Sequence, residues 1–196
     1  MENSLRSIFS FISVVSALAF LGLIALLHFL PNKYNPIKNT VSDYAIALSG
    51  GQHAFVAVAM PLAGAVSSLS LAAAMAANVG IAPTQTVLAL ILSSVGRFFL
   101  IFFPTDVPGQ PATRIGRIHL AFAITAFAGI AVAACNFNLT ARDEVLGQLA
   151  AVTAGLLLLG FFLPRLKKIF GLLERIALFS SVIWLVAAGV ELLFKG

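Results

Sequence analysis

The chain has few charged residues and only one cysteine. Charged residues make up 10% of its 196 positions, and hydrophobic ones make up 60%. An average soluble domain has about 25% charged residues, so a water-soluble fold is not expected. Cys135 has no second cysteine to pair with, which excludes an intrachain disulfide and a zinc site built of cysteines. The net charge of +5 rests on few residues, and a membrane location explains it better than nucleic-acid binding does.

Six long apolar runs account for most of the length. A helix that crosses a bilayer needs about 20 apolar residues, so this length holds six spans and no separate soluble domain. The runs are rich in Leu, Ala and Phe and lack the alternation of a transmembrane strand, which favours helices. We therefore predict an all-α membrane protein, a six-transmembrane-helix bundle forming a single polytopic domain over residues 1–196. The spans are expected near residues 7–30, 52–77, 85–103, 115–137, 145–163 and 175–193.

Lysine and arginine predict the orientation. Eight of them follow or flank the first, third and fifth runs, three lie on the opposite side, and Arg97 lies inside the third run. Because cytoplasmic loops carry the excess of basic residues, these three loops are expected in the cytoplasm and both termini on the non-cytoplasmic side. The eight are Lys33, Lys38, Arg114, Arg117, Arg165, Lys167, Lys168 and Arg175, and the three are Arg6, Arg142 and Lys195.

Polar side chains gather at this predicted cytoplasmic end. The histidines His28, His53 and His119 lie near the ends of their spans, and acidic residues occupy the loops beside them. Thr40 suits the N-cap of a short interfacial helix. The sequence thus predicts a ligand-binding or structural polar cluster. Its members are Ser42, Asp43, Arg97, Asp106, His119, Glu174 and Arg175.

Arg97 is the costliest residue to keep at its position. It lies seven residues before Pro104, or about 10 Å inside the end of its span, where an unpaired guanidinium is unfavourable. We expect a buried pair with a carboxylate. Asp106 is the nearest in sequence, and Asp43 and Glu174 are alternatives. Extension of the side chain to the headgroups is the other interpretation.

His119 and Asp106 are the candidates for catalysis. A neutral imidazole near a carboxylate can transfer a proton, or it can be an interfacial side chain satisfied by hydrogen bonds. No tight spacing of metal ligands occurs, so no metal site is predicted. No nucleophile elbow supports a triad of Ser42, His119 and Asp106. Glu174 is expected to face the bundle, and Arg175 to reach a lipid phosphate.

Three segments together resemble a known family. They are YNPIKNTVSDY at residues 34–44, FPTD at 103–106 followed by Ile118-His119, and GLLERI at 171–176 with Trp184. The chain resembles the prokaryotic membrane family catalogued as domain of unknown function 998. The resemblance implies a six-helix protein of the bacterial or archaeal cytoplasmic membrane, and it implies no activity or cofactor. The family's polar motif positions fall here on Ser42, Asp43, Asp106, His119, Glu174 and Arg175.

Three function classes stay open at this point. The charged end binds a lipid headgroup or small anion, or the chain is an accessory subunit of a larger membrane complex, or it is a membrane-embedded enzyme that modifies a lipid. Runs of alanine at residues 72–77 and 131–134 would suit close contact with a partner helix if they faced lipid. Pro61 is the only proline well inside a span, so a transporter with broken helices is not favoured.

Overall fold

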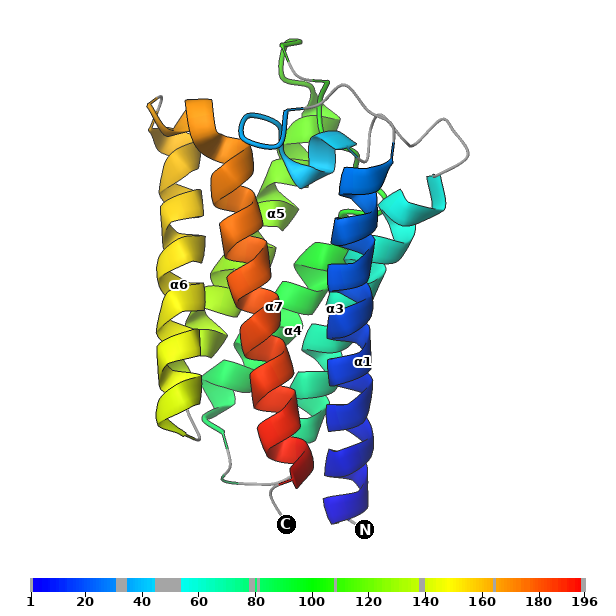
Figure 1. Cartoon of the computed structure of the whole chain (residues 1–196), viewed down its shortest axis with the longest axis vertical. Helices are drawn as coiled ribbons and strands as arrows, with labels where there is room; N and C mark the ends of the chain where they lie inside the picture. Colours follow the sequence, from blue (N-terminus) through cyan, green and yellow to red (C-terminus); the bar gives the residue numbers. More distant parts are fainter. Residues whose placement is uncertain are drawn as a thin grey trace.

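The computed structural model contains helices and no strand among the residues it describes. These are residues 2–30, 35–44, 54–77, 80, 82–107, 109–137, 140–163 and 165–194. His53 and Gln52, the predicted start of the second span, lie outside them. The elements are α1 (Glu2–Phe29), α3 (Ala54–Ala76), α4 (Thr84–Phe99), α5 (Arg114–Asn136), α6 (Ala141–Phe162), the 3-10 turn η1 (Leu166–Ile169) and α7 (Phe170–Phe194), with a helical turn at residues 41–44 (Figure 1).

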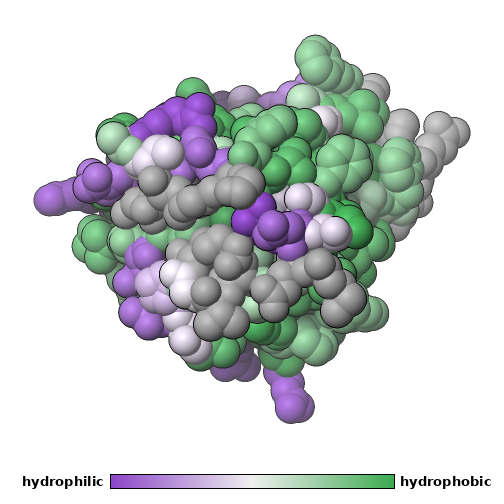
Figure 2. Space-filling model, turned by 90° about the horizontal axis from the view of Figure 1, so that it is seen from below, coloured by the Kyte–Doolittle hydropathy of each residue, from purple (hydrophilic) through white to green (hydrophobic). Residues whose placement is uncertain are grey.

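Within the described residues, five helical segments are long and apolar enough to cross a bilayer. They are Asn3–Phe29, Ala54–Ala76, Arg114–Asn136, Ala141–Phe162 and Leu166–Phe194, while α4 is apolar but only 16 residues long. Large hydrophobic side chains such as Phe11, Val152 and Ile183 are exposed along the helices, as lipid contact requires. In the view from the end that carries the termini, hydrophobic residues form much of the rim and hydrophilic ones occur in patches (Figure 2). The chain is an all-α, multi-pass membrane protein.

The helices form a closed ring in chain order. Each of the six long helices packs most extensively against its neighbours in sequence, and α7 completes the ring by packing against α1. The start of α1 and the end of α7 lie together at one end, and residues 35–44, 104–107 and 109–113 and η1 lie at the other (Figure 1). The polar loops are therefore gathered over one end of the ring.

Threonine side chains cap the helices that begin at polar loops. Thr113 accepts a hydrogen bond from the amide of Gly116 at the start of α5, and Thr140 accepts one from Asp143 at the start of α6. Thr40 accepts from the amide of Asp43, whose carboxylate accepts from the amide of Thr40. This reciprocal capping box starts the turn at 41–44 and confirms the helix start predicted at Thr40.

Hydroxyl groups and glycines hold neighbouring helices together. Ser13 on α1 and Ser67 on α3 each donate to the other's backbone carbonyl at 3.0 Å. Ser93 on α4 donates to the carbonyl of Ala126 on α5. At Gly129 on α5 a methyl group would lie 2.6 Å from the carbonyl oxygen of Ala89, so α4 and α5 are in backbone contact. Small residues permit such an approach where water supplies no hydrophobic driving force between helices.

Replacing Gly129 by alanine is expected to destabilise the protein by about 1–3 kcal/mol, because the new methyl group overlaps backbone atoms that have no room to move. Unfolding in a denaturing detergent measures the effect. Gly155→Ala on α6 is the matched control, since nothing lies within 4 Å of its added methyl group and alanine favours a helix. A Gly129→Ala protein as stable as Gly155→Ala would contradict the close packing of α4 and α5.

Candidate functional site

A cavity of about 340 Å³ opens inside the ring, at the end covered by the 35–44 segment, and all six long helices contribute to its wall. Its apolar lining includes Phe20, Met60, Phe127, Phe161 and Leu178. Its polar lining brings together six of the seven residues of the predicted cluster. These are Ser42, Asp43, Arg97, Asp106, His119 and Glu174.

Arg97 is buried in this cavity wall, with 4% of its surface exposed. Its guanidinium carbon lies 5.2 Å from the centroid of the Phe20 ring, a cation–π contact. On the neighbouring helix Gly64 provides the space, since a methyl group there would lie 2.8 Å from Nη1. Within the described residues Arg97 makes no hydrogen bond, and its buried Nε has no partner.

The predicted ion pair of Arg97 with Asp106 is wrong. No described carboxylate lies within 4.0 Å of the Arg97 nitrogens. Among the described residues, the ion pair at such a distance joins Arg142 and Glu191. Extension to the headgroups is excluded as well, since the side chain is almost fully buried. Arg97 lacks an ion pair because each of the three candidate carboxylates accepts a hydrogen bond from a backbone amide at the start of a helix. These are the carboxylates of Asp43, Asp106 and Glu174.

Asp106 is held at the start of α5. Its Oδ1 accepts from the Thr113 hydroxyl at 2.6 Å, and its Oδ2 accepts from the Thr113 amide at 3.0 Å. The carboxylate lies directly over Gly116, where an added methyl group would be 2.0 Å from Oδ2. Only glycine at position 116 leaves room for this arrangement, which turns the carboxylate toward the cap of α5.

Acidification is expected to loosen this junction. The hydrogen bond from the Thr113 side chain, the one from its amide and the nearby charges of His119 and Arg117 hold the pKa of Asp106 below its ordinary value. A carboxyl group with a lowered folded-state pKa stabilises the fold above its unfolded pKa, and that stabilisation is lost as pH falls through the folded pKa. Corrected for intrinsic rates, exchange of the Thr113 amide should therefore rise in acid. In Asp106→Asn this dependence should be absent, and its persistence would contradict the assignment.

Asp43 and Glu174 meet at the start of the 41–44 turn. Asp43 Oδ2 accepts from the amide of Thr40 at 2.8 Å and from Asn39 Nδ2 at 3.4 Å. Glu174, from the first turns of α7, accepts a short hydrogen bond from the amide of Val41 through Oε2. The amides at a helix start carry partial positive charge, so they favour both carboxylates.

His119 has a defined tautomer. Its Nδ1 lies 2.7 Å from the carbonyl oxygen of Phe103. Since a carbonyl only accepts, Nδ1 carries the proton in the neutral ring and Nε2 is left as an acceptor. His119 also interacts electrostatically with Asp106 and Asp43. Within the described residues no three His, Cys, Asp or Glu side chains are grouped as metal ligands.

The sequence of the chain matches a known protein family. The family described as "Protein of unknown function (DUF998)" matches residues 14–191, nearly the whole chain. The chain belongs to the DUF998 family. This confirms the resemblance drawn from the three sequence segments. No curated protein and no solved structure matches the chain.

Arg175 of this DUF998 protein serves the fold of the 35–44 segment, and the prediction that it reaches a lipid phosphate is wrong. Its Nη1 donates to the carbonyl oxygens of Pro36 at 2.8 Å, Asn39 at 2.7 Å and Gly171 at 2.9 Å. The guanidinium also stacks on the Tyr44 ring at 5.1 Å. Arg175 is 6% exposed and does not line the cavity. It clamps the cover of the cavity onto α7.

His28 completes this clamp, a role that sequence reasoning missed. Its Nε2 accepts from Nε of Arg175 at 3.0 Å, and its Nδ1 donates to the carbonyl oxygen of Ile24 at 2.8 Å. The amide of Leu172 adds a hydrogen bond to the carbonyl of Ile37. The only sequence signal was the position of His28 near the end of its span.

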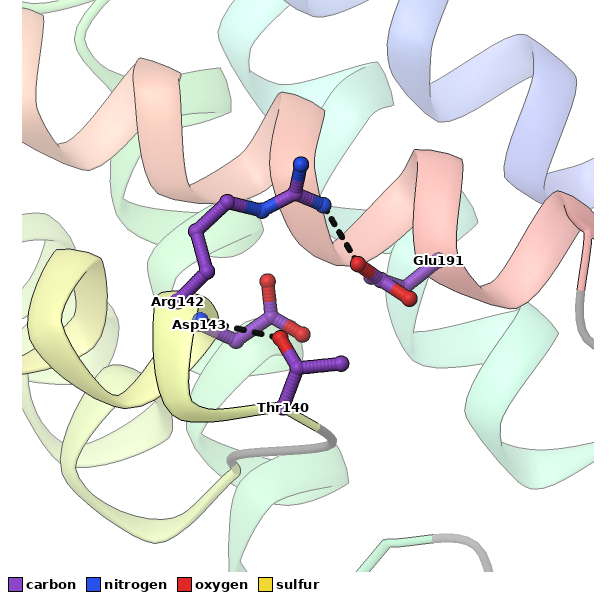
Figure 3. A network of polar contacts seen from close by, with 4 residues as sticks. All are labelled: Thr140, Arg142, Asp143 and Glu191. Carbon is purple, nitrogen blue, oxygen red and sulfur yellow. Dashed lines mark hydrogen bonds and ion pairs between the residues drawn. The ribbon is translucent and has the colours of Figure 1, made fainter.

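The opposite end of the DUF998 fold has its own polar contacts. Arg142 on α6 forms an ion pair with Glu191 on α7, beside the Thr140 cap that binds the amide of Asp143 (Figure 3). Arg6, expected at this surface, is buried in the structure with 5% exposure. These contacts lie at the end of the helices opposite the cavity. Variants of Arg142 therefore serve as controls for variants of residues in the cavity wall.

Proposed function

We propose that this DUF998 protein binds a ligand with an anionic group, a lipid headgroup or a small anion, and that Arg97 holds that group. The observation that carries the proposal is a guanidinium buried in a cavity wall with no hydrogen bond or ion pair in the described chain. A buried charge without a partner is costly, and an anion in the cavity removes that cost. An Arg–phosphate pair would be bidentate and charge-assisted.

The walls suit an amphipathic ligand. The cavity has the size of a small-molecule pocket, about 300–1,000 Å³ in general, and it is too small for a whole two-chain lipid. Phe20, Met60 and Phe127 offer apolar contacts in the same cavity wall as Arg97. A headgroup with the first part of its chain fits this combination of one cation and apolar walls.

The test measures the binding of phosphatidylglycerol and of inorganic phosphate to the purified protein, by thermal shift and by native mass spectrometry. Arg97→Gln should weaken binding by about tenfold or more, because a hydrogen bond to a charged group contributes about 1.5–3 kcal/mol. Arg142→Gln is the matched control, an exposed arginine at the other end of the helices. Equal binding by Arg97→Gln and the wild type would overturn the proposal.

The proposed topology has six spans, with α4 as the sixth, in a prokaryotic cytoplasmic membrane. Basic residues at the cavity end support a cytoplasmic mouth and termini outside, and they include Lys38, Arg117 and Lys168. In a Cys135→Ala background, the exposed Lys168→Cys thiol should react with an impermeant reagent only after the cells are opened. The exposed Glu144→Cys thiol should react in intact cells, and the reverse pattern would refute this orientation.

A membrane-embedded enzyme is the second candidate, favoured by the acceptor Nε2 of His119 in the cavity wall. It requires that His119→Gln abolish turnover of a bound lipid while binding persists. The accessory-subunit alternative has weaker support. Half of the alanines that would have formed a partner-facing surface pack inside the chain, since Ala72, Ala74, Ala133 and Ala134 are buried and Ala76 is exposed.

A further inference from the structure

The polar lining of the cavity contains more acid than base, and this excess bears on the ligand class within the function proposed above. Arg97 and His119 share the wall with three carboxyl groups, those of Asp43, Asp106 and Glu174. A ligand that carried only negative charge would bind Arg97 and face these carboxylates at the same time. Like charges so placed disfavour binding, which argues against a simple anion.

Two of the carboxylates present an unused oxygen. Asp43 binds backbone through Oδ2, and Glu174 does so through Oε2. Within the described part of the chain, Oδ1 of Asp43 and Oε1 of Glu174 accept no hydrogen bond, and neither belongs to the buried atoms that lack a partner. Both residues line the cavity, and the second oxygen of each is available to accept a hydrogen bond from a bound group. A carboxyl oxygen that carries no proton accepts hydrogen bonds, so the complementary group is an N–H or O–H donor.

We propose that the ligand is a zwitterion, with a phosphate or phosphodiester bound by Arg97 and a primary ammonium bound by Asp43 and Glu174. No described carboxylate lies within 4.0 Å of the Arg97 nitrogens, so a ligand that binds both Arg97 and the carboxylates needs a short chain between its two charged groups. Phosphoethanolamine has this chemistry, either free or as the headgroup of phosphatidylethanolamine. A primary ammonium has three N–H donors for the open oxygens, and a quaternary ammonium has none.

The binding test compares short-chain phosphatidylethanolamine, phosphatidylcholine and phosphatidylglycerol with free phosphoethanolamine on the purified full chain. We expect phosphatidylethanolamine to bind at least about tenfold tighter than the other two lipids, which corresponds to one charge-assisted hydrogen bond. Preference for the lipid would identify a membrane headgroup as the source, and equal binding of free phosphoethanolamine would identify a soluble one. Both outcomes support a zwitterion.

The decisive variant is the double replacement Asp43→Asn with Glu174→Gln. Each amide keeps an oxygen that can accept from the backbone at the 41–44 turn, but the negative charges are removed. Selectivity for phosphatidylethanolamine should fall about tenfold, and binding of phosphatidylglycerol should be retained or strengthened, which also shows that the variant is folded. Glu144→Gln, an exposed acid at the far end of α6, is the control and should change neither.

The possible failures separate the two proposals. Equal binding of phosphatidylcholine and phosphatidylethanolamine, or selectivity retained in the double variant, would overturn the binding of a primary ammonium by Asp43 and Glu174. Phosphatidylglycerol binding that depends on Arg97 would leave the anion site intact in that case. If none of these lipids and no phosphate bound in an Arg97-dependent manner, both proposals would fail.

Discussion

Arg97→Met is expected to make the ligand-free protein more stable by about 1–4 kcal/mol and to abolish anion binding. Replacement of a buried charge by an apolar side chain of similar volume removes the cost of desolvation, and this is most favourable where the charge has no partner. Arg97 has none in the described chain, and the flexible thioether can fill the space between Phe20 and Gly64.

Detergent or thermal unfolding with and without phosphatidylglycerol measures both effects. The lipid should raise the unfolding temperature of the wild type, because it binds the folded state, and should leave Arg97→Met unchanged. Arg142→Met is the control, and loss of its partly exposed ion pair should change stability by about 1 kcal/mol or less. A strongly destabilised Arg97→Met would show that the arginine supports the fold and would argue against a binding role.

Arg175→Ala is expected to destabilise the protein by about 3 kcal/mol or more and to release the 35–44 segment from α7. The substitution removes three hydrogen bonds to backbone carbonyls, one to His28 and the contact with Tyr44. Hydrogen bonds from a charged donor contribute about 1.5–3 kcal/mol each, and the carbonyls left behind lose their donor. Arg175→Lys should recover little, because a lysine cannot reproduce the planar fork of donors.

Hydrogen exchange of residues 35–44, together with unfolding, checks this expectation. Amides of Asn39 and Thr40 should lose protection in Arg175→Ala, and those in the middle of α5 should not. Arg165→Ala is the control, since its side chain is exposed beside η1. Wild-type protection of the 35–44 segment in Arg175→Ala would mean that Glu174 and Leu172 hold the cover without the arginine.

The helical membrane fold could be predicted because hydrocarbon leaves the backbone few choices. Each apolar run must satisfy its own hydrogen bonds, so length and composition indicate helices. The start of the turn at Thr40 was also readable, because a capping box is a local pattern. Arg97 could be assigned a depth from its distance to Pro104 along the chain.

Side-chain partners could not be predicted in the same way. Arg97 was expected to pair with Asp106, but the carboxylate is held by Thr113, seven residues away, and this depends on the exact path of the loop. Arg175 binds backbone carbonyl groups of residues more than 130 positions away in the sequence. Amino-acid composition does not show which backbone carbonyl groups accept a hydrogen bond. Spacing along one helix determines the position of a residue along the axis, but the fold determines what it faces.

The bonds of Arg175 also bear on how the protein is made. They join the last helix to a segment that leaves the ribosome 136 to 139 residues earlier. Chains are synthesised from the N-terminus, so α1 to α6 can enter the bilayer while the 35–44 segment still has no anchor. The 35–44 segment, which covers the cavity, is therefore held in place only after α7 has been inserted. A nascent chain halted before α7 is therefore expected to leave the anion site proposed at Arg97 without this cover.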